Sequence, residues 1–306
     1  MIIKSRDSKI ISIIGGTGMM GQMFSKVFKE KGYEVLIAGR STEITLKEAA
    51  EKGDLVIVCV PISATEKIIR EIGPFVRKEA ILSDFTSIKV KPYKEMQVYS
   101  KSQVIGGHPV FGPIPDLKGQ PFVICPERIS KKSLAWYKDL FKSIGLNIIE
   151  MTADEHDKQM AVIQCLNHLS NLSFANSITN LKFDLNDSKL FSPAFLLKLG
   201  LIKRMLSQSP SLYAEIETYN PYAKTIAKNY LQSLNEIKEN IDKEDKNALE
   251  DKIKKLQQYF ATLGQDKSVF IEKIPNLIKK SLDLLGKMAI LGPEYSYSHL
   301  LAKKVY

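Results

Sequence analysis

A glycine-rich turn near the start of the chain constrains the fold more than any other feature. Residues 10–14 form an apolar, β-rich run, and residues 21–31 have the spacing of an amphipathic helix that stops at Gly32. Between them lies the pattern G-x-G-x-x-G. In a strand–turn–helix unit, the first glycine allows the tight turn and the second lets the backbone approach a pyrophosphate. The third lets the helix pack on the strand.

This pattern predicts that a dinucleotide binds at the turn. Its phosphates would lie at the helix N-terminus, where free N–H groups and the helix dipole favour anions. The alternative is a glycine-rich turn with a structural role alone. The residues expected at the cofactor are Gly16, Thr17, Gly18, Met19, Met20 and Gly21.

Strand-like and helical segments alternate through the first half of the chain. The run at residues 55–60 is almost continuously apolar, as expected of a parallel strand buried on both faces. Residues 131–144 have helical spacing. The alternation predicts an α/β domain over residues 1–150, built as a Rossmann-type doubly wound parallel sheet. The segments expected as strands are residues 10–14, 34–38, 55–60, 80–83, 104–105 and 122–124.

The second half changes to helical spacing without strands. Apolar residues from Leu249 to Leu263 recur at spacings of three and four and make one stripe. We expect an all-helical domain over residues 151–265 that forms a homodimer, and a helical linker over residues 266–286. The segments expected as helices are residues 154–180, 192–207, 210–239 and 246–263.

Length and composition are those of a globular protein with about two domains. Among the 306 residues, 44% are hydrophobic and 25% are charged, and no apolar run is long enough for a membrane span. Cys59, Cys125 and Cys165 are widely spaced, which predicts reduced thiols in a cytoplasmic protein and no metal site. The net charge of +10 comes from scattered lysines, so we expect an anionic small molecule as partner rather than nucleic acid.

The end of the second predicted strand bears on the choice of cofactor. Enzymes that use NAD usually carry an acidic residue there to bind the ribose hydroxyls. Here the chain reads Gly-Arg-Ser-Thr, and no carboxylate occurs before Glu43. Arg40, Ser41 and Thr42 suit a 2′-phosphate, which favours NADP. If Arg40 is a solvated surface residue, NAD stays possible.

One histidine follows the predicted strands at a constrained position. His108 lies between the pair Gly106-Gly107 and Pro109, about ninety residues after the glycine turn. A dehydrogenase needs a group that takes a hydroxyl proton while hydride leaves, and the ordinary pKa of histidine suits that task. We therefore predict an oxidoreductase in which His108 accepts a proton.

Five motifs in order resemble the prephenate dehydrogenase (TyrA) family, over about residues 10–265. The turn at residues 84–89 has the family's D-x-x-S-x-K pattern, and residues 107–113 resemble its histidine loop. The other similar segments are residues 54–62, residues 155–161 with His168, and Arg204 with residues 210–213. In family members a second basic residue precedes the arginine, and this region offers only Lys198.

The resemblance implies a reaction: prephenate loses hydride and carbon dioxide to give 4-hydroxyphenylpyruvate in tyrosine biosynthesis. It implies that His108 takes the hydroxyl proton and that Ser87 bonds the same hydroxyl or orients His108. Arg204 would grip a carboxylate; a salt bridge across the dimer is its alternative. His168 would face the substrate, or else be an ordinary core residue. The remaining implied contacts are Lys89 with a substrate carboxylate, and Val60 and Pro61 with the nicotinamide.

Two further features belong to this interpretation. His156, in an acidic cluster, is expected to cap its helix or lie at the domain junction. Residues 287–306 contain a second resemblance, to the opening of a prephenate dehydratase domain. It implies that the natural protein is fused to such a domain or derives from a fusion, and a chance match is the alternative.

Other functions stay open at this point. Arogenate dehydrogenase uses the same chemistry on a substrate with an amino group, and no residue in the sequence decides between the two substrates. Another NADP-linked oxidoreductase with the same two-domain plan, such as a deazaflavin:NADP reductase, is a second alternative. A non-catalytic nucleotide-sensing module is a third, which the presence of His108 disfavours.

Overall fold

The computed structural model describes residues 9–185 and 190–261. The predicted linker at residues 266–286 and the segment at residues 287–306 lie outside these described parts, as does Leu263 of the apolar stripe.

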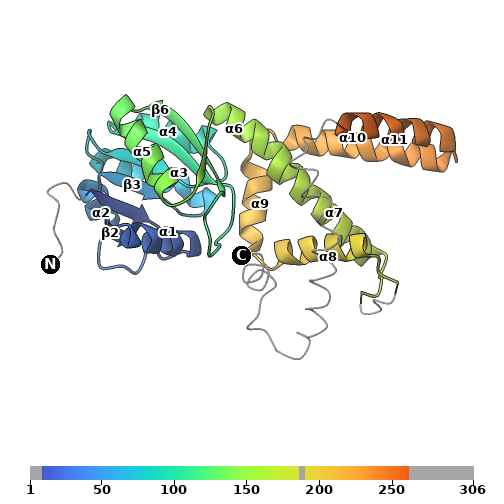
Figure 1. Ribbon diagram of the computed structural model, residues 1–306, viewed down its shortest axis with the longest axis horizontal. Helices are drawn as coiled ribbons and strands as arrows, with labels where there is room; N and C mark the ends of the chain where they lie inside the picture. Colours follow the sequence, from blue (N-terminus) through green and yellow to red (C-terminus); the bar gives the residue numbers. More distant parts are fainter. Residues whose placement is uncertain (1–8, 186–189, 262–306) are drawn as a thin grey trace. The chain divides into compact units, whose positions relative to one another are not determined.

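The chain divides into two compact units (Figure 1). The first comprises the chain up to Cys165 together with Ser211–Tyr222, and the second comprises Leu166–Pro210 and the chain from Ala223 onward. The first unit holds the sheet. Each unit is described by itself below.

A seven-stranded sheet forms the centre of the first unit, with strand order β2-β1-β3-β4-β5-β6-β7. The predicted fold class is confirmed, because the pairs from β2 through β5 are all parallel. β6 runs antiparallel to β5, since the eleven-residue connection between them carries no crossover helix. The strands are β1 (Ile10–Ile14), β2 (Glu34–Ala38), β3 (Leu55–Val58), β4 (Ile81–Asp84), β5 (Gln103–Pro109), β6 (Pro121–Arg128) and β7 (Asn147–Glu150).

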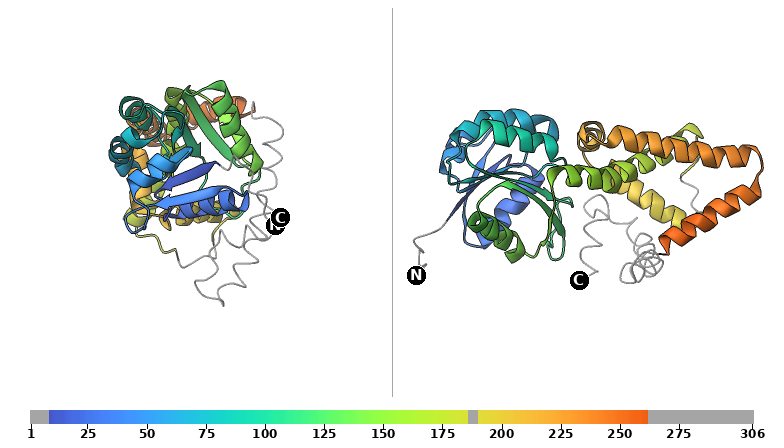
Figure 2. Two further views of the ribbon diagram at one scale, coloured as in Figure 1. Left: turned by 90° about the vertical axis from the view of Figure 1, so that its left-hand side faces the viewer. Right: turned by 90° about the horizontal axis from the view of Figure 1, so that it is seen from above.

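Helices cover both faces of this sheet (Figure 2). Alternate strand residues point to opposite faces, so Ile13 packs with Phe24 in one core while Ile14 packs with Ile69 in the other. The first core is covered by α1 (Met19–Glu30) and α5 (Lys131–Ser143). The second is covered by α2 (Leu46–Lys52), α3 (Ile62–Ile72) and α4 (Val90–Tyr99), with a 3₁₀ turn at Gly73–Phe75.

The predicted helix over residues 154–180 forms as one continuous run. It consists of α6 (Ala153–Met160), a π-helical stretch at Ala161–Leu166 and α7 (Asn167–Asn180). The boundary between the two units falls at the end of the π-helical stretch, after Cys165. π-Helical insertions in α-helices are frequently found at functional sites, and His168 lies two residues after this stretch, in the first turn of α7.

The predicted helix over residues 210–239 was wrong as one helix. It is split into α9 (Pro210–Tyr219) and α10 (Ala223–Asp242). Pro221 has no N–H to donate and disfavours a helical residue before it, so the helix ends there. Asn220 completes the break, because its Oδ1 accepts the N–H of Tyr222 at 2.8 Å.

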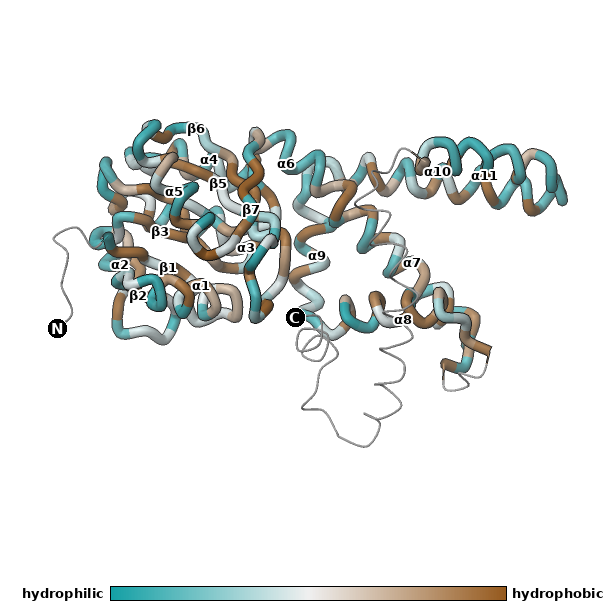
Figure 3. Tube along the Cα trace, viewed as in Figure 1, coloured by the Kyte–Doolittle hydropathy of each residue, from teal (hydrophilic) through white to brown (hydrophobic). Residues whose placement is uncertain are grey.

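The second unit is helical, as predicted. α8 (Pro193–Leu206) packs on α7, and α10 packs on α11 (Lys246–Phe260). In Figure 3 brown, hydrophobic positions alternate with teal, hydrophilic ones along α10 and α11. Several of their large apolar residues are exposed in the single chain, among them Leu231, Ile253, Leu256 and Phe260. No helix in the described parts has the length and apolar character needed to cross a membrane.

The three cysteines are free thiols. Cys125 and Cys165 are buried and Cys59 is half-buried. Burial raises the pKa of each thiol to about 12. They therefore stay protonated near neutral pH and are poor nucleophiles.

Candidate active site

The glycine turn has the close contacts that nucleotide binding requires. Gly15 follows β1 with φ +86°, so the left-handed residue of the tight turn is Gly15 rather than the predicted Gly16. A Cβ on Gly21 would lie 2.6 Å from the carbonyl oxygen of Gly15. Only glycine at this position therefore allows α1 to pack so closely on the turn. A Cβ on Gly18 would meet nothing nearer than 3.4 Å. The backbone is therefore open at Gly18, where a phosphate would approach the start of α1.

The turn lies at the point where the sheet changes direction of winding. β1 has β2 on one side and β3 on the other, and ligands of such sheets bind at this switch point, outside the carboxyl ends of the strands. Val60 follows β3 and lies against the turn: its Cγ1 would be 2.8 Å from a Cβ on Gly15. Pro61 is exposed at the start of α3. Val60 thus lies beside the glycine turn, and Pro61 follows it directly in the chain.

The loop after β2 contains three predicted cofactor residues, of which Thr42 has a structural role. The hydroxyl of Thr42 accepts the N–H of Gly39 at 2.8 Å and lies 2.9 Å from the carbonyl oxygen of Ile44. Thr42 therefore shapes the loop. Arg40 and Ser41 are exposed, and in the described parts of the chain neither side chain has a hydrogen bond or ion pair.

The structure assigns Lys89 a different task from the predicted one. Its side chain is 0% exposed, and its ammonium forms an ion pair with the carboxylate of Asp84 at the end of β4. The ammonium also donates to the carbonyl oxygen of Gly107 at 2.8 Å. The ammonium of Lys89 is thus bound by Asp84 of β4 and Gly107 of β5, so it connects the two strands. It does not face a substrate carboxylate. This role was not predictable from the sequence, since pairing of β4 with β5 is needed to bring Asp84 and Gly107 together around Lys89.

His108 is a strand residue rather than a loop residue, which corrects the expectation of a histidine loop. It occupies the penultimate position of β5, opposite Val123 of β6, and only 2% of its surface is exposed. Burial, then the neighbouring His156 and Lys89, hold the pKa of His108 well below its usual value. The imidazole is therefore neutral at neutral pH and can accept a proton.

One ring nitrogen of His108 is engaged and the other is not. Nδ1 lies 2.8 Å from Nε2 of His156 on α6. Among the described residues, none forms a hydrogen bond with Nε2 of His108. Ser87 is half-buried just after β4, the strand beside β5, and no hydrogen bond of the described residues engages its hydroxyl.

Three residues singled out in the sequence, Arg204, His168 and Lys198, lie on helices of the second unit. Arg204 lies on α8 and is exposed, whereas its neighbours Ile202 and Met205 are buried. Arg204 is exposed although its sequence neighbours are apolar, because residues one and two positions away lie on a different face of the helix. His168 is half-buried on α7. The ammonium of Lys198 donates to Oδ1 of Asn171 at 2.7 Å.

Comparison with known proteins gives matches over most of the chain. The family descriptions that match are "prephenate dehydrogenase, nucleotide-binding domain" at residues 24–150 and "prephenate dehydrogenase, dimerization domain" at residues 152–255. A probable arogenate/prephenate dehydrogenase of Methanocaldococcus jannaschii is 34% identical over 304 residues, which cover 89% of this chain and 68% of that protein. The T-protein of Haemophilus influenzae is 29% identical, over 92% of this chain and 74% of its own length.

The chain belongs to the prephenate dehydrogenase family. The predicted function is confirmed at this level: the protein is an NAD(P)-dependent prephenate/arogenate dehydrogenase of tyrosine biosynthesis. The resemblance of residues 287–306 to a dehydratase domain has no support from these matches and stays a prediction.

A solved structure supports the fold assignment of this family member. The prephenate dehydrogenase of Aquifex aeolicus, in complex with hydroxyphenyl propionate and NAD+, superposes with a TM-score of 0.70. Its sequence is 19% identical, and the match covers 85% of this chain and all of that one. At this identity the likeness concerns the fold alone.

Sequence reasoning missed two buried residues of this dehydrogenase. His156 is 0% exposed and contacts His108, so the expectation that it caps α6 was wrong. The cap of α6 is a reciprocal pair, Thr152 with Glu155. Asp157, also 0% exposed, lies 2.8 Å through its Oδ1 from Nδ1 of His156. The adjacent His-Asp pair was one signal for them in the sequence.

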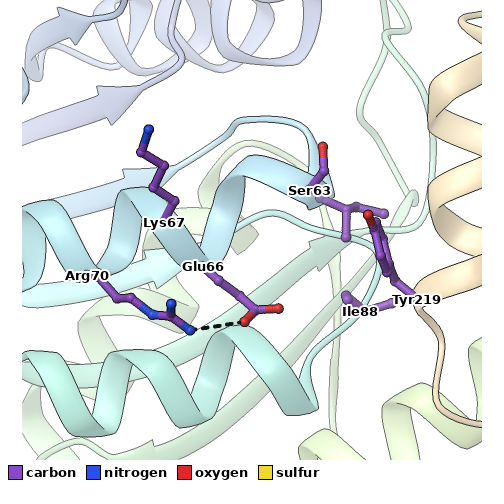
Figure 4. A pocket seen from close by; sticks show the side chains of 7 residues that line it. Ser63, Glu66, Lys67, Arg70, Ile88 and Tyr219 are labelled. Carbon is purple, nitrogen blue, oxygen red and sulfur yellow. Dashed lines mark hydrogen bonds and ion pairs between the residues drawn. The ribbon is translucent and has the colours of Figure 1, made fainter.

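A surface hollow of about 270 Å³ lies elsewhere in the first unit (Figure 4). Its lining contains none of the predicted site residues. Its most basic lining residue, Arg70, is already paired, with its Nε 2.6 Å from Glu95. Ser63 donates to Glu215 at 2.6 Å. Arg70 and Ser63 thus already have partners, and we assign this hollow no role in the reaction.

Proposed function

We propose that this chain converts prephenate to 4-hydroxyphenylpyruvate with NADP as cofactor. The nicotinamide, when bound, supplies the acceptor for the hydride that leaves the hydroxyl-bearing ring carbon. The hydroxyl proton goes to His108, the ring carboxylate leaves as carbon dioxide and the ring becomes aromatic, and the resulting phenolate oxygen takes a proton back. The observation that carries the proposal is a buried, neutral His108 with an unengaged Nε2, on the sheet that presents the glycine turn.

Three other residues are proposed to contact the substrate. Ser87 has an unengaged hydroxyl after β4, which suits a hydrogen bond to the substrate hydroxyl. Arg204 is exposed without an ion pair in the described residues, and its planar guanidinium can bind a carboxylate through two hydrogen bonds. His168 on α7 is proposed to contact the substrate as well.

The first experiment follows reduced nicotinamide by absorbance with prephenate or arogenate and NADP or NAD. We expect turnover to be fastest with prephenate and NADP, and His108→Asn to lower kcat by about 100-fold or more. Nucleotide affinity of the variant, measured by titration, should be unchanged. Faster turnover of arogenate would replace the proposed substrate, and a fully active His108→Asn would refute the proposed proton acceptor.

The preference for NADP rests on Arg40. Its exposed guanidinium has no competing partner among the described residues, and the loop from Gly39 to Thr42 carries no carboxylate to repel a 2′-phosphate. Arg40→Ala should raise the KM for NADP about tenfold and leave the KM for NAD within about twofold. Lys31→Ala, which removes another exposed cation of the same unit, is the matched control. Equal effects on both cofactors would contradict the assignment.

We also propose that the second unit forms a homodimer through its exposed apolar helix surfaces. Leu234 of α10 and Leu256 of α11 are 43% and 49% exposed in the single chain. Exposed apolar surface of this kind on neighbouring helices is typical of an interface. Leu256→Asp should shift the molar mass from dimer to monomer in light scattering. Gln257→Asp, at an exposed polar neighbour, should not.

A further inference from the structure

His108 is connected to a buried carboxylate through a second imidazole. Nδ1 of His108 lies 2.8 Å from Nε2 of His156, and Nδ1 of His156 lies 2.8 Å from Oδ1 of Asp157. All three side chains are at most 2% exposed. The two imidazole rings meet edge to face, with centroids 5.0 Å apart. This chain of hydrogen bonds connects β5 to α6 across 48 positions of sequence.

The direction of the hydrogen bonds follows from the surroundings of Asp157. Its Oδ1 accepts the N–H of Lys89 at 2.7 Å, and its Oδ2 accepts the N–H of Val90 at 3.0 Å. These two residues begin α4, which has no side-chain cap of its own. Asp157 therefore caps a helix of a different part of the chain. The helix N-terminus favours the anionic form of the carboxyl and opposes the effect of burial, which raises the pKa of Asp157.

Because both carboxylate oxygens of Asp157 accept hydrogen bonds, the ring nitrogen that meets Oδ1 must be the donor. His156 thus carries its proton on Nδ1. Burial lowers the pKa of His156 to about 2, so the ring is neutral and its Nε2 has a lone pair. That lone pair can only accept from Nδ1–H of His108. The Nε2 of His108 is then the nitrogen without a proton.

We propose that His156 and Asp157 are positioning residues that hold His108 in the tautomer with an unprotonated Nε2. This inference rests on the proposed function, in which His108 takes the hydroxyl proton. When Nε2 accepts that proton, Nδ1–H of His108 still donates to His156. His156 in turn still donates to the carboxylate of Asp157. The other nearby charge, the ammonium of Lys89, is balanced by Asp84.

The tautomers can be observed directly on the whole protein. The chain has four histidines, so long-range ¹H–¹⁵N spectra of ¹⁵N-histidine-labelled protein, assigned with His108→Asn and His156→Gln, identify each ring. We expect both His108 and His156 to carry the proton on Nδ1. A proton on Nε2 of either ring in the native protein would overturn the proposal, and this readout does not depend on any variant being active.

Kinetics provide the second test. His156→Leu removes the acceptor of Nδ1–H, and we expect kcat to fall about 100-fold while the KM for NADP changes less than about threefold. His156→Gln restores an acceptor, so its kcat should lie within about tenfold of the native value. A Gln variant as slow as the Leu variant would mean that the ring acts only as packing, which would overturn the proposal.

The double variant separates failure of this inference from failure of the proposed function. If His156 acts through His108, adding His156→Leu to His108→Asn should lower kcat no further than about twofold. Full activity of His108→Asn alone would remove the proposed proton acceptor and the inference with it. Loss of activity in His108→Asn together with native kcat in both His156 variants would refute the positioning role alone.

Discussion

Acidification should lower the free energy of unfolding of the first unit, because two of its histidines are buried in the neutral form. His108 and His156 are 2% and 0% exposed, and burial is the main cause that lowers the pKa of each ring. In the folded protein the pKa of His156 is about 2, and that of His108 is well below its usual value. In the unfolded chain both rings take up protons near their ordinary pKa of about 6.5.

The sign and size of the effect follow from proton linkage. Below about pH 6.5 the unfolded chain binds protons at these rings and the folded chain does not, so the free energy of unfolding falls as the pH falls. Each histidine lowers it by about 1.4 kcal/mol between about pH 7.5 and about pH 5.5, which makes roughly 3 kcal/mol for the pair. The loss continues downward until the folded rings themselves titrate. The raised pKa of Asp157 acts in the opposite direction.

Urea unfolding measures this loss, with the fluorescence of Trp136 as the signal. The chain has a single tryptophan, and it lies on α5 of the first unit, so the signal reports the unit that holds both histidines. We expect His156→Gln, which keeps only one of the two rings, to lose about half as much stability as the native protein over the same pH range. An equal loss in both proteins, or no loss in the native protein, would refute the reasoning.

Further substitutions test the site by other means. Lys89→Met leaves the buried carboxylate of Asp84 without its partner and should lower the free energy of unfolding by about 3–5 kcal/mol in urea titrations; adding Asp84→Asn should recover most of it. Gly21→Ala places a Cβ 2.6 Å from the carbonyl of Gly15 and should lower both the melting temperature and NADP affinity. Gly18→Ala meets no atom nearer than 3.4 Å, so it should reduce affinity with a melting temperature close to the native value.

The parts of the fold that follow local rules were predictable from the sequence. The glycine turn, the alternation of strands with helices and the helical second half depend on residues near one another in the chain. The errors also have local causes. The break at Pro221 was overlooked within a helical pattern, and β6 was taken as parallel although no crossover helix precedes it. The exposure of Arg204 shows that an apolar neighbourhood in sequence does not fix the face of a helix.

The site was predictable only where one residue carries the signal. His108 stands out because glycines and a proline constrain it, whereas the roles of Lys89 and His156 depend on partners that folding brings together. Lys89 was expected to contact a substrate carboxylate, yet its ammonium forms a buried ion pair with Asp84. No rule on sequence spacing could pair these partners with the correct strands.

One signal for the missed carboxylate was nevertheless present in the sequence. The segment before α4 reads Ser-Ile-Lys, and Lys89, at the N-cap position, offers no side chain that can accept the free N–H groups of the helix start. Buried N–H groups require acceptors, so a buried helix start without a local cap implies an anion supplied from elsewhere in the chain. Asp157 is that anion, and the same carboxylate orients His156. Asp157 thus caps α4 and, in the proposed mechanism, also orients His108 through His156.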